Sequence, residues 1–145
     1  PCYWNRPDKT DETMRDGWIY AGDRFRCDED GFYFFLGRID DLVKVSGQWV
    51  YPLEVELCLN EHPQIVECAV AAVQMPDRRT ILRAFVRPAA STTPGDDLTV
   101  SLKTYIRQTL LPHKAPRDFI YLEDLPKTGT GKIDRQALLR LRGNV

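Results

Sequence analysis

The spacing of apolar residues predicts the helices of the second half of the chain. One helix face, with the spacing i, i+4, i+7, i+8 and i+12, is formed by Leu98, Leu102, Tyr105, Ile106 and Leu110. Asp96 or Asp97 is the expected N-cap of this helix, and Pro112 is expected to stop it. A last helix is expected after Asp134, which can cap it, and before Gly143.

Residues 52–61 fit two interpretations. Apolar residues alternate from Leu53 to Leu59, as they do in a strand. Pro52, however, fits the first position of a helix, where Glu54 and Glu56 would be favoured by the helix dipole. We therefore predict a helix that ends at His62-Pro63.

Runs of β-branched, aromatic and other apolar residues predict five strands. They cover residues 32–36, 41–45, 65–73, 80–86 and 118–122. Residues 37–40 are expected to join the first two strands in a hairpin, and residues 1–23 are interpreted as loop with one short strand. The order of the elements predicts an α+β fold, a small domain in which a β-hairpin and a short, mainly antiparallel sheet pack with about three helices.

The composition excludes several classes of protein. Of the 145 residues, 43% are hydrophobic and 28% charged, with a formal net charge of −1, so neither nucleic acid nor a membrane surface is an expected partner. No apolar run approaches the roughly 20 residues of a membrane span. Without an initiator Met or a signal peptide, the chain is interpreted as a fragment of a longer polypeptide.

The four cysteines predict neither a zinc site nor a disulfide framework. No pair has the Cys-x-x-Cys spacing, and neither histidine lies close to a cysteine in the sequence. Cys58 and Cys68 lie among apolar residues, as small core side chains do. Free thiols of this kind suit a reducing compartment, so we expect a cytoplasmic protein.

The segment 125–132 is the strongest candidate for chemistry, with the sequence Leu-Pro-Lys-Thr-Gly-Thr-Gly-Lys. Its glycines allow a tight backbone, and Lys132 offers a positive charge on a flexible stem, which suits a phosphate. The segment is not a Walker A loop, because Ile133 follows the lysine and the glycines are too close together. Its Leu-Pro-x-Thr-Gly pattern is not a cell-wall sorting signal, since no apolar span follows. Taken alone, it fits a mobile surface loop better than a site.

Two further segments contain candidate ligands for a nucleotide. Asp23 follows Gly22, and such a carboxylate can accept hydrogen bonds from both hydroxyls of a ribose. Residues 37–47 have the sequence Gly-Arg-Ile-Asp-Asp-Leu-Val-Lys-Val-Ser-Gly. Taken alone, Gly22-Asp23 is a common turn, and Arg38 with Asp40 is typical of a surface ion pair.

The three segments together, in this order and spacing, resemble the C-terminal part of the adenylate-forming superfamily. That superfamily comprises acyl-CoA synthetases, nonribosomal-peptide adenylation domains and luciferases. The resemblance runs from about Tyr3 to Arg140, nearly the whole chain. Within the superfamily, residues 44–56 look most like those of benzoate and other aromatic acid–CoA ligases.

The resemblance implies a two-step reaction. The enzyme joins a carboxylic acid to ATP, giving an acyl-adenylate and pyrophosphate, and then transfers the acyl group to a thiol, here that of CoA. Residues 1–39 would be the end of a large N-terminal adenylation body and the lead-in to a hinge, and residues 40–145 a mobile C-terminal lid domain. Mg²⁺ would be bound mainly by the N-terminal body, as would the acid, so the chain alone is expected to be inactive.

The resemblance also implies roles for individual residues of the nucleotide site. Asp23 would hold the ribose hydroxyls of ATP, and Arg38 would contact the ribose or a phosphate. Asp40 would be the hinge between the two conformations. Lys132 would be the catalytic residue, stabilising charge as the carboxylate attacks the α-phosphorus.

A second group of residues would bind CoA after the domain rotates. Lys44, Ser46 and Gly47 would line the pantetheine channel, where a side chain at Gly47 would obstruct passage. Lys114 and Arg117 occupy positions that contact the CoA nucleotide in related ligases, although Ala115 replaces a position that is often basic. No residue is predicted to bind a metal.

Two alternative functions remain open at the level of sequence. An adenylation domain that loads a carrier protein would have the same motifs and a different acceptor. A noncatalytic α+β module that binds a partner would explain each motif separately but not their common order.

Overall fold

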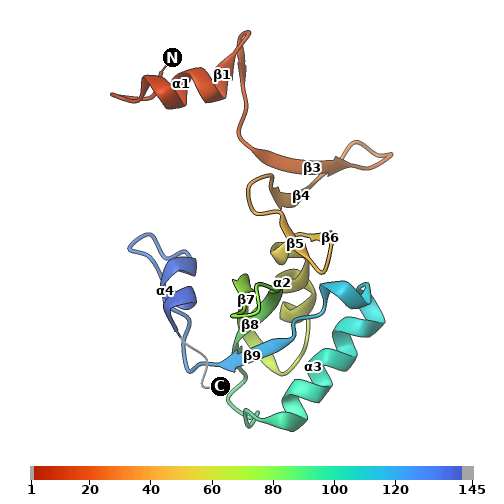
Figure 1. Cartoon of the computed structure of the whole chain (residues 1–145). Helices are drawn as coiled ribbons and strands as arrows, with labels where there is room; N and C mark the ends of the chain where they lie inside the picture. The colour runs from red at the N-terminus through yellow and green to blue at the C-terminus, as the bar shows by residue number, and fades with distance from the viewer. Residues whose placement is uncertain (1, 142–145) are drawn as a thin grey trace. The chain divides into compact units, whose positions relative to one another are not determined.

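A computed structural model of the chain describes residues 2–141, so the expected helix end at Gly143 lies outside the described residues (Figure 1). The chain divides into two compact units, Pro1–Asp41 and Leu42–Val145. Each unit is described by itself.

The first unit consists of short elements. They are helix α1 (Pro7–Thr13), strands β1 (Met14–Arg15) and β2 (Trp18–Ile19), and strands β3 (Asp23–Cys27) and β4 (Tyr33–Arg38). Helix α1 was not expected from the sequence; it begins with a proline at its first position and Asp8 in its first turn, both favourable there. It buries none of its residues, and therefore shows no apolar spacing.

The predicted pairing of residues 32–36 with 41–45 is wrong. Strand β4 pairs antiparallel with β3 instead, and residues 28–32 form the connection. The Asp28 carboxylate accepts hydrogen bonds from the backbone N–H groups of Asp30 (3.1 Å) and Phe32 (2.9 Å), and Gly31 has φ +86°. This turn chemistry closes the hairpin on the N-terminal side of β4.

The second unit begins with a separate hairpin and continues with a sheet and three α-helices. The hairpin consists of β5 (Val43–Val45) and β6 (Gln48–Val50). The sheet strands are β7 (Ile65–Gln74), β8 (Thr80–Pro88) and β9 (Asp118–Tyr121). The helices are α2 (Pro52–Asn60), α3 (Asp96–Thr109) and α4 (Arg135–Arg140), with a 3-10 helix η1 (Pro112–Lys114).

The sheet has the order β7-β8-β9, as the green and blue arrows of Figure 1 show. Strands β7 and β8 are antiparallel, and β8 and β9 are parallel. The predicted α+β fold with a mainly antiparallel sheet is confirmed, and so is the choice of a helix for residues 52–60.

Alternation along the strands places a separate hydrophobic core on each face of the sheet. The larger core contains Val70 and Leu82 from the strands and buried residues of α2 and α3, including Leu59 and Leu102. The smaller core, on the other side, is formed by Ala69, Phe85, Leu125 and Leu138. The segment that contains Lys132 is thus anchored on the face opposite to α2 and α3.

The predicted caps of two helices have different outcomes. Asp134 is the N-cap of α4, and its carboxylate accepts a hydrogen bond from the Ala137 N–H (2.9 Å), as predicted. Neither Asp96 nor Asp97 caps α3, because both already lie in its first turn and Gly95 is the N-cap. There the two acids can still interact favourably with the helix dipole.

None of the helices within residues 2–141 has the length and apolar character required to cross a lipid bilayer.

Candidate functional site

The β3–β4 hairpin of the first unit brings Asp23, Arg38 and Asp40 together. Asp23 and Arg38 are direct cross-strand partners, and the Arg38 Nη1 donates to Asp23 Oδ1 at 3.3 Å. Its Nη2 donates to Asp40 Oδ2 and its Nε lies near Asp40 Oδ1, both at 3.1 Å. One guanidinium therefore bridges two carboxylates that are 17 residues apart in the sequence.

Gly22 allows this arrangement by its lack of a side chain. A Cβ at this position would lie 3.2 Å from the Arg38 Nη2, and the backbone has φ +75°. The Gly22 carbonyl accepts a hydrogen bond from the Ile39 N–H at 2.8 Å, which fixes the chain just before Asp40. The positive φ is thus the main reason for a glycine before Asp23, since the end of the Arg38 side chain would need to move only by a few tenths of an ångström.

The charges of this cluster reinforce one another. The hydrogen bond from Arg38 lowers the pKa of Asp40, and the bond to Asp40 raises the pKa of Arg38. The three side chains are between 31% and 67% exposed, so they remain accessible to a ligand. An exposed carboxylate held beside a guanidinium can accept from a diol while the guanidinium faces a phosphate.

The boundary between the two compact units falls next to Asp40. The first unit ends at Asp41 and the second begins at Leu42. Asp40 lies within a turn that is closed by a hydrogen bond from the Asp41 N–H to the Arg38 carbonyl at 3.3 Å.

The loop that ends at Lys132 is a closed turn in the second unit. The Thr128 N–H donates to the Lys132 carbonyl (2.7 Å), and the Gly131 N–H donates to the Thr128 carbonyl (2.9 Å). Lys127 and Ile133 form an isolated antiparallel bridge at the base of the loop. With φ +82°, Gly131 adopts a conformation that favours glycine. The loop is an ordered hairpin-like turn rather than a mobile segment without internal contacts.

The two lysines of this loop differ in their surroundings. Lys127 forms an ion pair with Glu67, with 3.0 Å between Nζ and Oε1. Lys132 is exposed, and among residues 2–141 no carboxylate forms an ion pair with it. An ammonium without an internal partner can interact with an incoming anion without first losing an existing bond.

The predicted CoA-binding residues Lys44, Ser46 and Gly47 lie in the β5–β6 hairpin. Ser46 (φ +49°) and Gly47 (φ +85°) are the two turn residues between Val45 and Gln48, a turn in which both φ values are positive. The Lys44 ammonium lies 5.7 Å from the ring centre of Trp49, an exposed residue on the opposite strand. A Cβ at Gly47 would meet nothing within 4 Å among the described residues. Within these residues, the positive φ of the turn is therefore the reason for a glycine at this position.

Lys114 and Arg117, the other predicted CoA-binding residues, have different environments. The Lys114 Nζ donates to both carboxylate oxygens of Glu54 at 2.6 and 2.7 Å, and joins η1 to α2. Arg117 is exposed, and its backbone N–H donates to the Leu82 carbonyl at 3.0 Å. Lys114 therefore already has an anionic partner in this structure.

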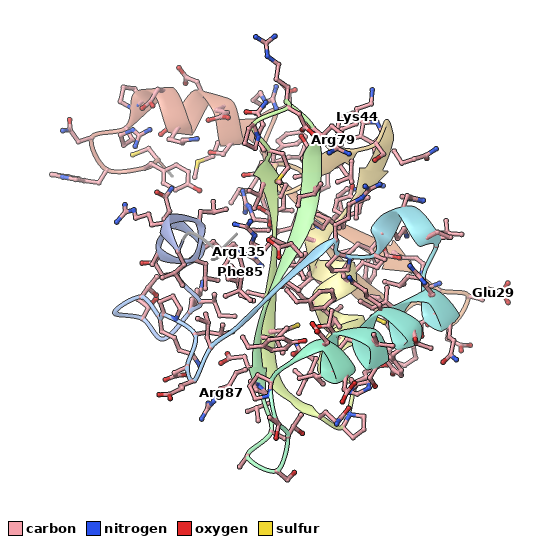
Figure 2. The ribbon with its side chains drawn as sticks, turned by 60° about the horizontal axis from the view of Figure 1, so that its bottom comes forward. Glu29, Lys44, Arg79, Phe85, Arg87 and Arg135 are labelled. Atoms are coloured by element: carbon pink, nitrogen blue, oxygen red, sulfur yellow. The ribbon has the colours of Figure 1, made fainter. Side chains whose placement is uncertain are left out.

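Sequence reasoning did not identify the contact between Glu56 and Arg135. Glu56 was expected to lie in the first turn of its helix for reasons of dipole, but only Glu54 does so. Glu56 is 5% exposed and forms a two-pronged ion pair with Arg135, the first residue of α4. Figure 2 shows Arg135 between α4 and the green strands β7 and β8.

The sequence matches one known domain family. A family model described as the AMP-binding enzyme C-terminal domain matches residues 54–132, more than half of the chain. Of the predicted site residues, this region includes Lys114, Arg117 and Lys132, and its last residue is Lys132.

Curated relatives and solved structures agree with this match. A 3-hydroxybenzoate–CoA/4-hydroxybenzoate–CoA ligase from Thauera aromatica is 43% identical over 94% of the chain and 26% of its own length. An acetyl-coenzyme A synthetase from Bacillus subtilis is 40% identical over 93% of the chain and 24% of its own length. The structure of a benzoate CoA ligase from Burkholderia xenovorans LB400 has a TM-score of 0.85 at 37% identity, covering 96% of the chain and 27% of that protein. The chain thus spans about a quarter of the relatives that it matches.

Proposed function

Because this chain belongs to the AMP-binding enzyme C-terminal domain family, we propose that it is the C-terminal part of an AMP-forming acid–CoA ligase. The observation that carries the proposal is the co-occurrence of the Asp23–Arg38–Asp40 cluster with an exposed Lys132, on an ordered loop, that has no ion-pair partner within residues 2–141. Relatives named as CoA ligases match both regions in one alignment of nearly the whole chain.

The proposed first step is the adenylation of a carboxylate. A carboxylate oxygen attacks the α-phosphorus of ATP, a new oxygen–phosphorus bond forms, and pyrophosphate leaves. Negative charge increases on the phosphoryl oxygens in the transition state, where the Lys132 ammonium would be the stabilising cation. A preorganised donor of this kind accelerates acyl or phosphoryl transfer by roughly 100- to 1,000-fold.

The nucleotide is proposed to lie against the first unit. Asp23 accepts hydrogen bonds from the ribose hydroxyls, and Arg38 donates to the ribose or a phosphate. Residues 1–39 then belong to the end of an N-terminal adenylation body, and residues 40–145 form the mobile lid domain with Asp40 as the hinge. The division of the chain beside Asp40 supports this hinge.

The second step is proposed to use the other group of residues. The CoA thiolate attacks the acyl carbon, a carbon–sulfur bond forms, and AMP leaves. Lys44, Ser46 and Gly47 form the turn that faces pantetheine, and Lys114 and Arg117 contact the CoA nucleotide. The exposed, tightly turned hairpin at Gly47 supports the first of these roles.

We propose an aromatic, benzoate-like acid as the substrate. Support comes from the names of the hydroxybenzoate and benzoate ligases among the relatives. The similarity to an acetyl-coenzyme A synthetase indicates that this part of the enzyme is shared between acid specificities. The acid is therefore selected by the N-terminal body, and steady-state rates of the full-length polypeptide with benzoate, hydroxybenzoates and acetate test the assignment.

Mg²⁺ and cellular location complete the proposal. Among residues 2–141, no group of three or more histidine, cysteine or acidic side chains could hold a metal ion, so Mg²⁺ is proposed to be held by the N-terminal body with ATP. Cys58 and Cys68 are buried as free thiols, and burial raises the pKa of both. Unreactive core thiols of this kind suit the cytoplasm.

The decisive experiment separates the two half-reactions in the full-length polypeptide. In Lys132→Ala, ATP–pyrophosphate exchange should fall at least about 100-fold, while thioester formation from supplied acyl-adenylate and CoA remains within about twofold. Lys127→Ala is the matched control, because that lysine lies in the same loop but is bound to Glu67. Equal loss of both half-reactions in Lys132→Ala contradicts the proposal, and so does pyrophosphate exchange by the 145-residue chain alone.

A further inference from the structure

A buried carboxylate joins the two faces of the sheet at the edge of β7. Glu56, on α2, accepts hydrogen bonds from Arg135 Nη1 to Oε1 at 2.7 Å and from Nη2 to Oε2 at 2.9 Å. Helix α2 packs in the larger core and α4 in the smaller one, which lies on the other face. The ion pair therefore passes around the free edge of the sheet.

The same two side chains satisfy the backbone of Val70 on that edge. The Val70 N–H donates to Glu56 Oε1 at 2.7 Å, and the Val70 carbonyl accepts from Arg135 Nη1 at 2.9 Å. Carboxylate and guanidinium thus replace the acceptor and donor that a further strand would supply. The position of Arg135 is fixed by three hydrogen bonds with the backbone and side chain of other elements, not by surface charge alone.

Arg135 lies three residues after Lys132, and rigid contacts connect the two positions. The Asp134 N–H donates to the Pro126 carbonyl at 2.8 Å, and the Asp134 carboxylate caps the helix that Arg135 begins. At the other end of the loop, Leu125 is 2% exposed in the smaller core. The Glu56–Arg135 pair is therefore one of the contacts that hold the backbone of Lys132 relative to the sheet, together with the buried Leu125.

We propose that Glu56 and Arg135 are positioning residues for Lys132, with no contact of their own with the substrate. This inference rests on the proposed role of Lys132 in adenylation. Because a displacement of about 1 Å at a catalytic group can cost about 100-fold in rate, an anchor on the sheet matters for chemistry beyond its effect on folding. Lys44, Ser46 and Gly47 lie on a separate hairpin that this anchor does not include.

The test compares three variants of the full-length polypeptide in the two half-reactions. Arg135→Lys keeps the positive charge but loses the paired hydrogen bonds of the guanidinium to Glu56. Glu56→Gln keeps an acceptor for the Val70 N–H but loses the negative charge. Both should lower kcat for pyrophosphate exchange by about 10- to 100-fold, with KM for ATP changed less than threefold. Thioester formation from supplied acyl-adenylate should stay within about twofold of wild type.

Arg83→Lys is the matched control. Arg83 is a buried arginine that, like Arg135, pairs with a carboxylate from another element, Asp118 at 2.5 Å, but this pair joins β8 to β9 and not to α4. The Arg83→Lys variant should leave the ratio of the rates of the two half-reactions unchanged. The inference is overturned if Arg135→Lys keeps full pyrophosphate exchange or slows both half-reactions by the same factor. Failure of the proposed function itself would be recognised separately, by a Lys132→Ala variant that still adenylates.

Discussion

Asp23 and Arg38 face each other across the first pair of the β3–β4 hairpin, and the guanidinium of Arg38 continues from Asp23 to Asp40. This relationship connects a proposed nucleotide ligand with a proposed hinge through one side chain. Any motion of the chain at Asp40 that breaks its contact with Arg38 also changes the donor beside Asp23. The nucleotide site and the hinge are therefore expected to be coupled.

Replacement of Asp23 tests the ribose contact. In the full-length polypeptide, Asp23→Asn should raise KM for ATP by at least about 10-fold, since a hydrogen bond to a charged group contributes about 1.5–3 kcal/mol. Initial rates at varied ATP concentration measure the effect. Glu29→Gln removes an exposed acid from the turn of the same hairpin and should leave KM for ATP unchanged. An unaltered KM in Asp23→Asn would show that the ribose is bound elsewhere.

Alanine substitutions at two glycines with similar positive φ values should slow different half-reactions. Gly47 (φ +85°) and Gly131 (φ +82°) both lie in open space, so alanine at either position costs about 1–2 kcal/mol in conformation alone. Gly47→Ala should slow thioester formation from supplied acyl-adenylate and preserve pyrophosphate exchange. Gly131→Ala, in the Lys132 loop, should do the reverse.

The comparison of these variants is internally controlled. A general loss of stability would affect both half-reactions in both variants, and thermal unfolding of each variant measures that loss. Parallel losses of the two activities in Gly47→Ala and Gly131→Ala would contradict the separation of the two sites.

The helices and strands of the second unit could be predicted because their apolar residues are buried at regular intervals. Leu98, Leu102 and Ile106 are 3% exposed or less, and residues 68–70 at the centre of β7 are buried in the two cores. Helix α1 was not predicted because it buries nothing, and its polar residues follow no period. The incorrect hairpin has another cause, since the sequence did not predict a strand at residues 23–27, which pair with β4 in the structure.

In the candidate site, too, residues within short motifs could be predicted, and contacts between residues far apart in the sequence could not. Asp23, Arg38 and Lys132 lie in short motifs, so their residue types and spacing can be recognised in the sequence. Glu56 and Arg135 are 79 residues apart, and neither lies in a pattern that indicates a partner. The position of Glu56 in its own helix predicted only an interaction with the helix dipole, whereas its hydrogen-bond partners lie on β7 and α4.

Lys114 and its partner Glu54 allow a direct test of the CoA contact. Glu54→Gln removes the negative charge that holds the Lys114 ammonium. This variant should therefore lower KM for CoA or keep it unchanged. Lys114→Met should raise KM for CoA several-fold, as should Arg117→Ala. Steady-state rates at varied CoA concentration provide the measurement. If Lys114→Met and Glu54→Gln lower thermal stability equally and leave KM for CoA as in wild type, Lys114 has a structural role only.

His62 should make the stability of the domain dependent on pH. It is 8% exposed, its Nδ1 accepts a hydrogen bond from the Gln64 N–H at 3.3 Å, and its Nε2 lies 3.3 Å from the Ser101 hydroxyl. Burial lowers the pKa of His62, so the unfolded chain, with a histidine pKa of about 6.5, binds the proton more readily. The free energy of unfolding should therefore fall as the pH decreases below about 6.5, by up to about 1.4 kcal/mol per pH unit.

Urea unfolding of the 145-residue chain between pH 7 and pH 5 measures this dependence. Asp8, Asp40 and Asp77 do not interfere, because hydrogen bonds from neighbouring arginines lower their pKa values and their stabilisation is lost only as the pH falls well below this window. His62→Gln should be less stable than wild type at pH 7 and should have a flatter profile toward pH 5. A profile for His62→Gln as steep as that of wild type would assign the pH dependence to another group.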